Sequence, residues 1–226
     1  MALSYRGDFF KEHAEQYDYL SDEDFSIVKE SLPTFPLNGT LLDLGCGSGA
    51  VGGRLRLLFP QLTVIGTDIC LPLLKWVSFQ KCQSDVSHLP FEDESLDGIV
   101  AAAAFHHFPD IRTAIRECAR CLKPRGGFLC YDPNKLHPQR LTMMTDPLRQ
   151  FFYKTGDHAI SPMHLRDILI KENFREVKIR YVAFKGKGRS RIAGVNYDIV
   201  RKLSCSRLDW LLRVIAPWFI ITATKV

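Results

Sequence analysis

Glycines and a carboxylate in one short segment give the first indication of chemistry in this sequence. Residues 41–53 read LLDLGCGSGAVGG, so an apolar run carries Asp43 and then turns glycine-rich. Three glycines fall at alternate positions: Gly45, Gly47 and Gly49. Glycine permits positive φ and a close approach of ligand to main chain, and a helix that begins there offers unpaired N–H groups. The pattern predicts a ligand-binding turn between a strand and a helix.

A second carboxylate ends the next apolar run. Asp68, in VIGTDIC, lies nineteen residues beyond Gly49. At this point of a strand–turn–helix–strand unit, a carboxylate can accept hydrogen bonds from both hydroxyls of a ribose. The glycine corner and the two acids together predict a site for a nucleoside-containing cofactor.

Two kinds of cofactor fit this corner. Gly45, Gly47 and Ala50 match the G-x-G-x-x-A pattern of dinucleotide-binding enzymes, so an NAD(P)-dependent oxidoreductase is one interpretation. Asp43 argues against it, because a carboxylate is unfavourable beside a pyrophosphate and favourable beside a cationic amino acid or a sulfonium.

Two histidines follow the apolar run 97–103. His106 and His107 lie just beyond the predicted carboxyl end of a strand, where ligands bind in open α/β sheets. An imidazole there can take a proton from a hydroxyl or an amine near neutral pH. The alternative is that one of them caps the following helix or packs in the wall of the crevice. We favour His107 as the catalytic base, with His106 as the other candidate.

The elements that must position these residues alternate along the chain. Strands are expected at 40–45, 62–67, near 81–84, 97–103, 126–131, 174–184 and 218–224, and helices at 49–58, 71–78, 110–122 and 162–172. Such alternation, with nearly continuous apolar strands, predicts an α/β fold with a doubly wound, mostly parallel sheet.

The remaining segments give the predicted domain organisation. Residues 1–37 read as a helical N-terminal cap, and 38–226 as the main domain. Two segments outside the alternation, 132–161 and 185–217, are expected to cover the substrate side. The first contains LTMMTDPLRQFFYKTG, an apolar and aromatic stretch suited to the floor of an acceptor pocket, although simple packing onto the sheet is the alternative.

Composition restricts the class of protein. The chain has 226 residues, and no apolar run reaches the roughly 20 residues that span a bilayer. The acidic N-terminal segment has no signal-peptide pattern. The seven cysteines, an odd number, suit reduced thiols, so a cytoplasmic location is expected. The net charge of +5 has its basic excess at 175–213, but no aromatic-interleaved basic stripe accompanies it, which disfavours nucleic acid as a partner.

One cysteine pair could suggest a metal. Cys118 and Cys121 form a C-x-x-C, yet the surrounding IRTAIRECARCLKP has helical periodicity and no second ligand pair follows. Packing of a helix is the preferred interpretation, and no metal is expected.

A set of motifs in fixed order resembles a known family. The pattern comprises D-x-G-x-G-x-G from Asp43, Asp68, Asp85, LPF-x-x-x-S-x-D at 89–97, the HH pair, LKPRGG and DPN. It is similar to the small-molecule branch of the class I S-adenosylmethionine-dependent methyltransferases, over residues 17 to about 183. The resemblance implies a Rossmann-like seven-stranded sheet, with its last strand antiparallel between two others and an insertion after the fifth strand.

The resemblance also implies roles for particular residues. Asp43 and the main chain of Gly45, Cys46, Gly47 and Gly49 would hold the methionine part of S-adenosylmethionine, and Asp68, with Ile69 beside it, the ribose. Asp85 and Val86 would face the adenine. Tyr17 matches a tyrosine that closes over the cofactor. Ala102 stands where many relatives have asparagine, so a main-chain carbonyl would take the cofactor's amino group there.

The expected reaction is in-line displacement of a methyl group onto oxygen, nitrogen or carbon of a small, partly apolar molecule. A base is required only where the nucleophile arrives protonated. FHHFPD at 105–110 replaces the Arg-Asn motif of quinone-modifying relatives, which argues against a quinone acceptor. The alternatives to this activity are the oxidoreductase and a non-catalytic S-adenosylmethionine-binding protein. The oligomeric state is not readable from the sequence.

Overall fold

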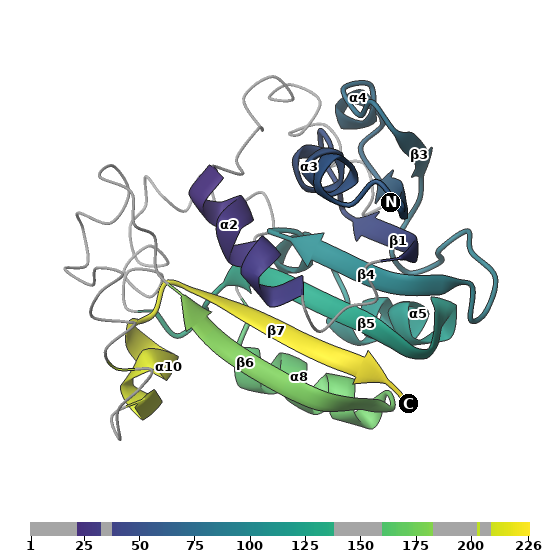
Figure 1. The fold of residues 1–226 in the computed structure, drawn as a ribbon. Coiled ribbons are helices and arrows are strands. Elements are labelled where there is room, and N and C mark those ends of the chain that lie inside the picture. The colour runs from purple at the N-terminus through teal and green to yellow at the C-terminus, as the bar shows by residue number, and fades with distance from the viewer. Residues whose placement is uncertain (1–21, 33–37, 138–159, 183–202, 204–208) are drawn as a thin grey trace.

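The computed structural model describes residues 22–32, 38–137, 160–182, 203 and 209–226. Its centre is one seven-stranded sheet in the order β3-β2-β1-β4-β5-β7-β6 (Figure 1). The strands are β1 (Gly39–Leu44), β2 (Leu62–Asp68), β3 (Gln80–Gln83), β4 (Leu96–Ala102), β5 (Leu122–Pro133), β6 (Phe174–Val182) and β7 (Trp218–Lys225). The described part of the chain contains no helix that is long and apolar enough to cross a membrane.

The sheet is parallel except at β7. Strands β1 to β5 pair in parallel, whereas β7 runs antiparallel to both β5 and β6 and lies between them. The doubly wound α/β sheet and its antiparallel last strand are therefore confirmed. Because the parallel strands end at one edge, the residues that follow β1, β2, β4 and β5 gather there.

Helices cover both faces of the sheet (Figure 1). They are α2 (Asp22–Ser31), α3 (Ala50–Leu58), α4 (Leu71–Leu74), α5 (Ile111–Cys121), α8 (Pro162–Lys171) and α10 (Leu212–Ile215), with 3-10 turns η3 (Phe105–His107) and η5 (Asp209–Leu211). One apolar core lies between the sheet and α5 and α8, and a second lies under α2, α3 and α4. Each face therefore buries its own layer of side chains.

Helix α5 shows how local sequence sets an element. Asp110 caps its N-terminus, and its carboxylate accepts hydrogen bonds from the main-chain N–H groups of Arg112 and Thr113 at 2.9 and 3.3 Å. Cys118 and Cys121 are fully buried on this helix, as the periodicity predicted. Among the described residues, no group of three or more His, Cys, Asp or Glu side chains could hold a metal ion.

Two elements, α4 and β5, have limits that differ from the prediction. Helix α4 ends at Leu74 instead of 78, because Val77 and Phe79 turn towards α3 and fill the space over Gly49 and Gly52. Strand β5 begins at Leu122 instead of 126, because Leu122 already pairs with Leu96 before an irregularity in the register.

Candidate active site

The glycine corner joins β1 to α3 and is built from left-handed main-chain conformations. Gly45, Gly47 and Gly49 have φ of 67°, 54° and 85°. A Cβ added at Gly49 would lie 2.9 Å from the Phe79 ring, whereas one at Gly47 would meet no atom of the described residues within 4 Å. Packing therefore requires glycine at 49, as does its positive φ, and none of the described residues fills the side of the turn at Gly47, where a ligand can approach the main chain.

Asp43 lies beneath this corner and is 1% exposed. Its Oδ2 accepts a hydrogen bond of 2.8 Å from the main-chain N–H of Gly52 in the first turn of α3. Its pKa is raised to about 7, chiefly by burial and also by the nearby charge of Asp68, while the hydrogen bond from Gly52 opposes the rise. None of the described lysines or arginines contributes a compensating charge. A buried carboxylate in this state is complementary to a cationic ligand.

Asp68 ends β2 and holds the corner from the other side. Its Oδ2 accepts from Gly47 N at 2.9 Å and its Oδ1 from Cys70 N at 2.8 Å. Burial raises its pKa, and these hydrogen bonds and the charge of His107 oppose the rise. Each carboxylate oxygen has a second lone pair, so the carboxylate can hold the turn and still accept from a ligand hydroxyl.

The end of β3 adds a further group of predicted residues. Asp85 Oδ1 accepts from the N–H and the hydroxyl of Ser87, both at 2.8 Å, and so shapes its own turn. Val86 packs partly buried against the core under α5, while Ile69, beyond β2, is 42% exposed. The structure brings the ends of β2 and β3 together through the hydrogen bond from Gln83 Nε2 to Ile69 O.

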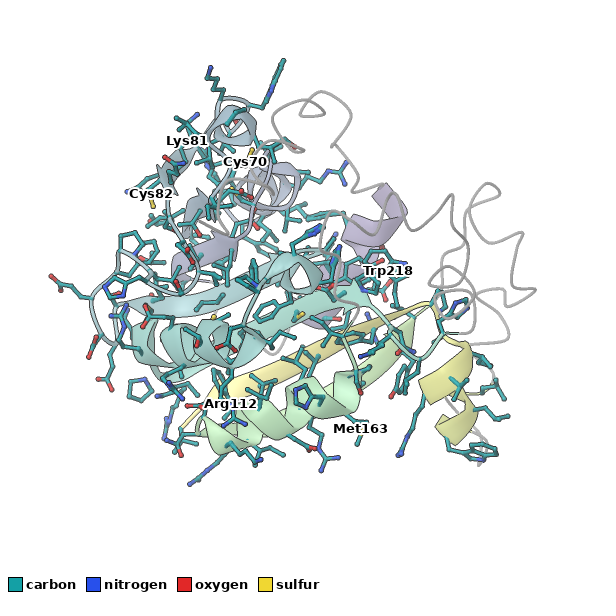
Figure 2. All side chains as sticks on the ribbon, turned by 180° about the vertical axis from the view of Figure 1, so that it is seen from behind. Cys70, Lys81, Cys82, Arg112, Met163 and Trp218 are labelled. Atoms are coloured by element: carbon teal, nitrogen blue, oxygen red, sulfur yellow. The ribbon has the colours of Figure 1, made fainter. Side chains whose placement is uncertain are left out.

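The chain after β4 is bent by an unusual main-chain conformation. Ala102 ends the strand, and Ala103 has φ of 54°, which costs a residue with a Cβ about 1 kcal/mol. A hydrogen bond of 2.7 Å from Ala103 N to Tyr131 O holds the bend. Tyr131 stacks on Trp218 at 4.7 Å between ring centroids, and Figure 2 labels Trp218 near the start of β7. The bend directs the chain into η3, which carries both histidines.

The two histidines have different neighbours. His106 is 7% exposed, and its Nδ1 lies 2.6 Å from Oδ1 of Asp132, a fully buried residue near the end of β5. The His107 ring packs against that of His106 in a tilted arrangement, with ring centroids 3.9 Å apart and planes at 42°, and the charge of His107 lowers the pKa of Asp68. Asp132 was not predicted as a site residue. The sequence feature that could have indicated this role is the position of Asp132 in DPN, at the end of an apolar run.

The LPF-x-x-x-S-x-D motif positions elements. Arg120 on α5 donates to the carbonyl oxygens of Leu89 and Phe91 at 3.0 and 2.8 Å, and to Asp93 at 2.8 Å. Glu117 accepts from both Arg120 and Leu89 N. These contacts, which we call the Arg120 clamp, tie the loop between β3 and β4 to α5. The predicted adenine residues, Asp85 and Val86, lie at the start of this loop.

Some predicted features lie outside the described residues. They include Tyr17, most of the segment 132–161 with its Met-rich stretch, and most of 185–217. Of the residues predicted for the cofactor, all but Tyr17 lie at or just beyond the carboxyl ends of β1, β2, β3 or β4, at the same edge of the sheet.

Comparison with known proteins agrees with this geometry. Residues 42–130 match the family model of a methyltransferase domain. A solved S-adenosylmethionine-dependent methyltransferase from Archaeoglobus fulgidus has the same fold, with a TM-score of 0.70 and 20% identity over 96% of this chain and 99% of that one. The chain is therefore similar to a methyltransferase domain over residues 42–130, and it shares its fold with a solved S-adenosylmethionine-dependent methyltransferase.

Curated relatives are similar over part of the chain. Demethylmenaquinone methyltransferase of Thermotoga maritima is 31% identical over 51% of both chains. Malonyl-[acyl-carrier protein] O-methyltransferase 1 of Coxiella burnetii is 32% identical over 60% of this chain and 47% of its own. The chain spans about half the length of these relatives, and their names differ in the acceptor.

Proposed function

We propose that this protein is an S-adenosylmethionine-dependent methyltransferase that acts on a small, partly apolar molecule. The observation that carries the proposal is Asp43, a buried carboxylate that has no cationic partner among the described residues and lies beneath an open glycine turn. A sulfonium cofactor with an amino acid portion supplies the missing positive charge. A pyrophosphate would add negative charge at the same place, which disfavours the oxidoreductase alternative.

The residues at the sheet edge would divide the cofactor between them. Asp43 and the glycine turn would bind the methionine part, Asp68 with Ile69 the ribose, and Asp85 with Val86 the adenine. The cofactor supplies an activated methyl group on sulfur. Most of the catalysis would then come from holding the acceptor atom in line with that methyl group and excluding water.

The acceptor would enter at the ends of β4 and β5, where the bend at Ala103, the histidines and the Tyr131–Trp218 pair meet. The two relatives described above act on a quinone precursor and on a carrier-bound acid, by their names. FHHFPD in place of the quinone-type motif supports a non-quinone acceptor. We propose residues 1–37 and the segments 132–161 and 185–217 as its cover, with 38–226 as the methyltransferase domain.

A cytoplasmic location is part of this proposal. It is supported by the six described cysteines, which form no disulfide with one another and four of which are buried. Thiols in this state suit a reducing compartment.

Calorimetric titration of the purified protein with S-adenosylmethionine and, separately, with NAD and NADP tests the proposal. We expect binding of S-adenosylmethionine alone. Asp68→Ala should lose at least tenfold in affinity while the circular dichroism spectrum stays native, because a hydrogen-bonded charged acceptor contributes about 1.5–3 kcal/mol. Glu92→Gln, at an exposed acid, serves as the matched control and should bind like the parent.

Two outcomes would contradict the assignment. Unchanged affinity in Asp68→Ala would remove the ribose role, and binding of a nicotinamide cofactor instead would favour the oxidoreductase. Single-turnover transfer of a labelled methyl group to any member of an acceptor panel would exclude a non-catalytic binding protein.

A further inference from the structure

We infer that His106 is the proton acceptor of the reaction, through its Nε2, and that Asp132 is the positioning residue that fixes its tautomer. The inference rests on the proposed methyltransferase function. It extends that function by naming the class of acceptor, a hydroxyl or amine that still carries its proton, and by reversing the preference for His107 drawn from the sequence.

The contacts of Asp132 carry the first step. This carboxyl group is fully buried, and donors approach both of its oxygens. His106 Nδ1 lies 2.6 Å from Oδ1, and the main-chain N–H of Phe105 donates to Oδ2 at 2.9 Å. The thiol of Cys130 lies 3.7 Å from Oδ2 as a weak third donor. An ionised carboxylate only accepts hydrogen bonds, and this arrangement of donors matches it.

The tautomer of His106 follows from that acceptor. In a neutral imidazole one ring nitrogen carries the proton and the other carries a lone pair. Because Asp132 accepts at Nδ1, the Nδ1–H form is favoured, and Nε2 is the nitrogen that can receive a proton. The Phe105 N–H bond to the same carboxylate fixes the main chain next to the ring, so Asp132 sets both the position and the protonation pattern of His106.

The place of the dyad in the fold carries the second step. Asp132 lies in β5 and His106 follows β4, and these neighbouring parallel strands end at the edge where ligands bind in such sheets. The charge of the neighbouring His107, by contrast, lowers the pKa of Asp68 at the cofactor corner. His106 lies on the β5 side, because its partner Asp132 belongs to β5.

The chemistry of such a dyad needs a protic acceptor. His106 Nε2 takes the proton while the acceptor oxygen or nitrogen bonds to the methyl carbon, and the carbon–sulfur bond breaks with its electron pair remaining on sulfur. The positive charge that leaves the cofactor then resides on the imidazolium, where the Asp132 carboxylate stabilises it. An orienting carboxylate that holds a catalytic imidazole in this way follows the general logic of a base with a third, positioning group.

Nitrogen NMR of the cofactor-free protein, labelled at histidine nitrogen, tests the tautomer without any acceptor. At pH 9, His106 should show a protonated Nδ1 and an unprotonated Nε2, with the signals assigned by their loss in His106→Asn. In Asp132→Ala the proton should move to Nε2. A parent protein in which His106 carries its proton on Nε2 would overturn the inference, even if the Asp132 variant fails to fold.

Kinetics separate this inference from the proposed function. With the first panel acceptor that the parent protein methylates, His106→Asn and Asp132→Asn should lower kcat by about 10²–10⁴-fold, the usual contribution of a general base. The affinity for S-adenosylmethionine should stay within twofold, and Glu92→Gln should leave both quantities unchanged. A parent that does not bind S-adenosylmethionine contradicts the proposed function. A parent that transfers methyl, with His106→Asn equally fast, contradicts the dyad alone.

Discussion

Asp43 lies near the midpoint of its own titration at neutral pH, because burial raises its pKa from 3.8 to about 7. The unfolded chain keeps the ordinary value, so between these two pH values the folded protein binds more protons than the unfolded one. The contribution of Asp43 to the free energy of unfolding is therefore greatest below its pKa in the unfolded chain, 3.8. This contribution is lost as pH rises through its pKa in the folded protein, about 7. A ligand that supplies positive charge reverses this, since it favours the ionised carboxylate.

Cofactor affinity should accordingly rise with pH. Between pH 6 and 7, we expect the association constant for S-adenosylmethionine to increase by up to about tenfold per unit, with release of the Asp43 proton, and to level off above pH 7. Calorimetry at pH 6, 7 and 8 in buffers of different ionisation enthalpy measures both the affinity and the proton release. Asp43→Asn keeps an acceptor for Gly52 N and should lose this slope. Equal slopes in the two proteins would remove Asp43 as the titrating group.

At the scale of elements, α3 contains two adjacent glycines, of which Gly52 has no space for a side chain and Gly53 has space for one. A Cβ at Gly52 would lie 2.4 Å from the Phe79 ring and 2.9 Å from Asp43 Oδ2, whereas a Cβ at Gly53 has 4.0 Å to its nearest neighbour, in Phe79. Gly53→Ala should therefore stabilise the protein by about 0.5–1 kcal/mol, the helix-propensity difference between the two residues. Gly52→Ala should destabilise it by about 1–3 kcal/mol through overpacking. Urea denaturation measures both, and a stabilising Gly52→Ala would contradict the packing over Asp43.

The Arg120 clamp determines whether the loop between β3 and β4 is held against α5. Arg120→Ala should lower the free energy of unfolding by about 1–3 kcal/mol, because two main-chain carbonyls and Glu117 lose a charged donor. Hydrogen exchange should rise at residues 85–95.

Arg116, one turn away on α5, is the matched control, since its side chain is 62% exposed and its ion pair with Glu172 spans 3.5 Å. Its alanine variant should change stability by less than about 0.5 kcal/mol. Similar losses in both variants would show that the clamp adds nothing beyond surface charge.

At the scale of the whole molecule, the sequence predicted the limits of those strands that apolar periodicity and turn residues determine. The strands at β1, β2, β4 and β7 begin or end within one residue of their expected limits, because apolar runs bounded by glycine or polar residues determine them. The position of β7 between β5 and β6 came from the family resemblance alone. No local pattern encodes which strand a final apolar run will pair with.

The site was predictable where its parts are adjacent in the chain. Asp43 and the glycine corner share one turn, and Asp68 has a characteristic spacing from it. The pair of His106 and Asp132 was missed because 26 residues separate them, and only the parallel pairing of β4 with β5 brings them together. The contact of Asp68 with Gly47 N was missed for the same reason.

The antiparallel insertion of β7 has a consequence for biosynthesis. Strand β6 emerges from the ribosome before β7. In the described sheet β6 pairs with β7, and β7 separates β6 from β5. Until the final strand is translated, β5 therefore presents an unpaired edge and β6 has no strand to join. Unpaired edges of this kind promote aggregation of nascent chains. Synthesis that stalls before β7 should thus leave a chaperone-dependent intermediate, with β1 to β5 assembled and the last two strands still to be added.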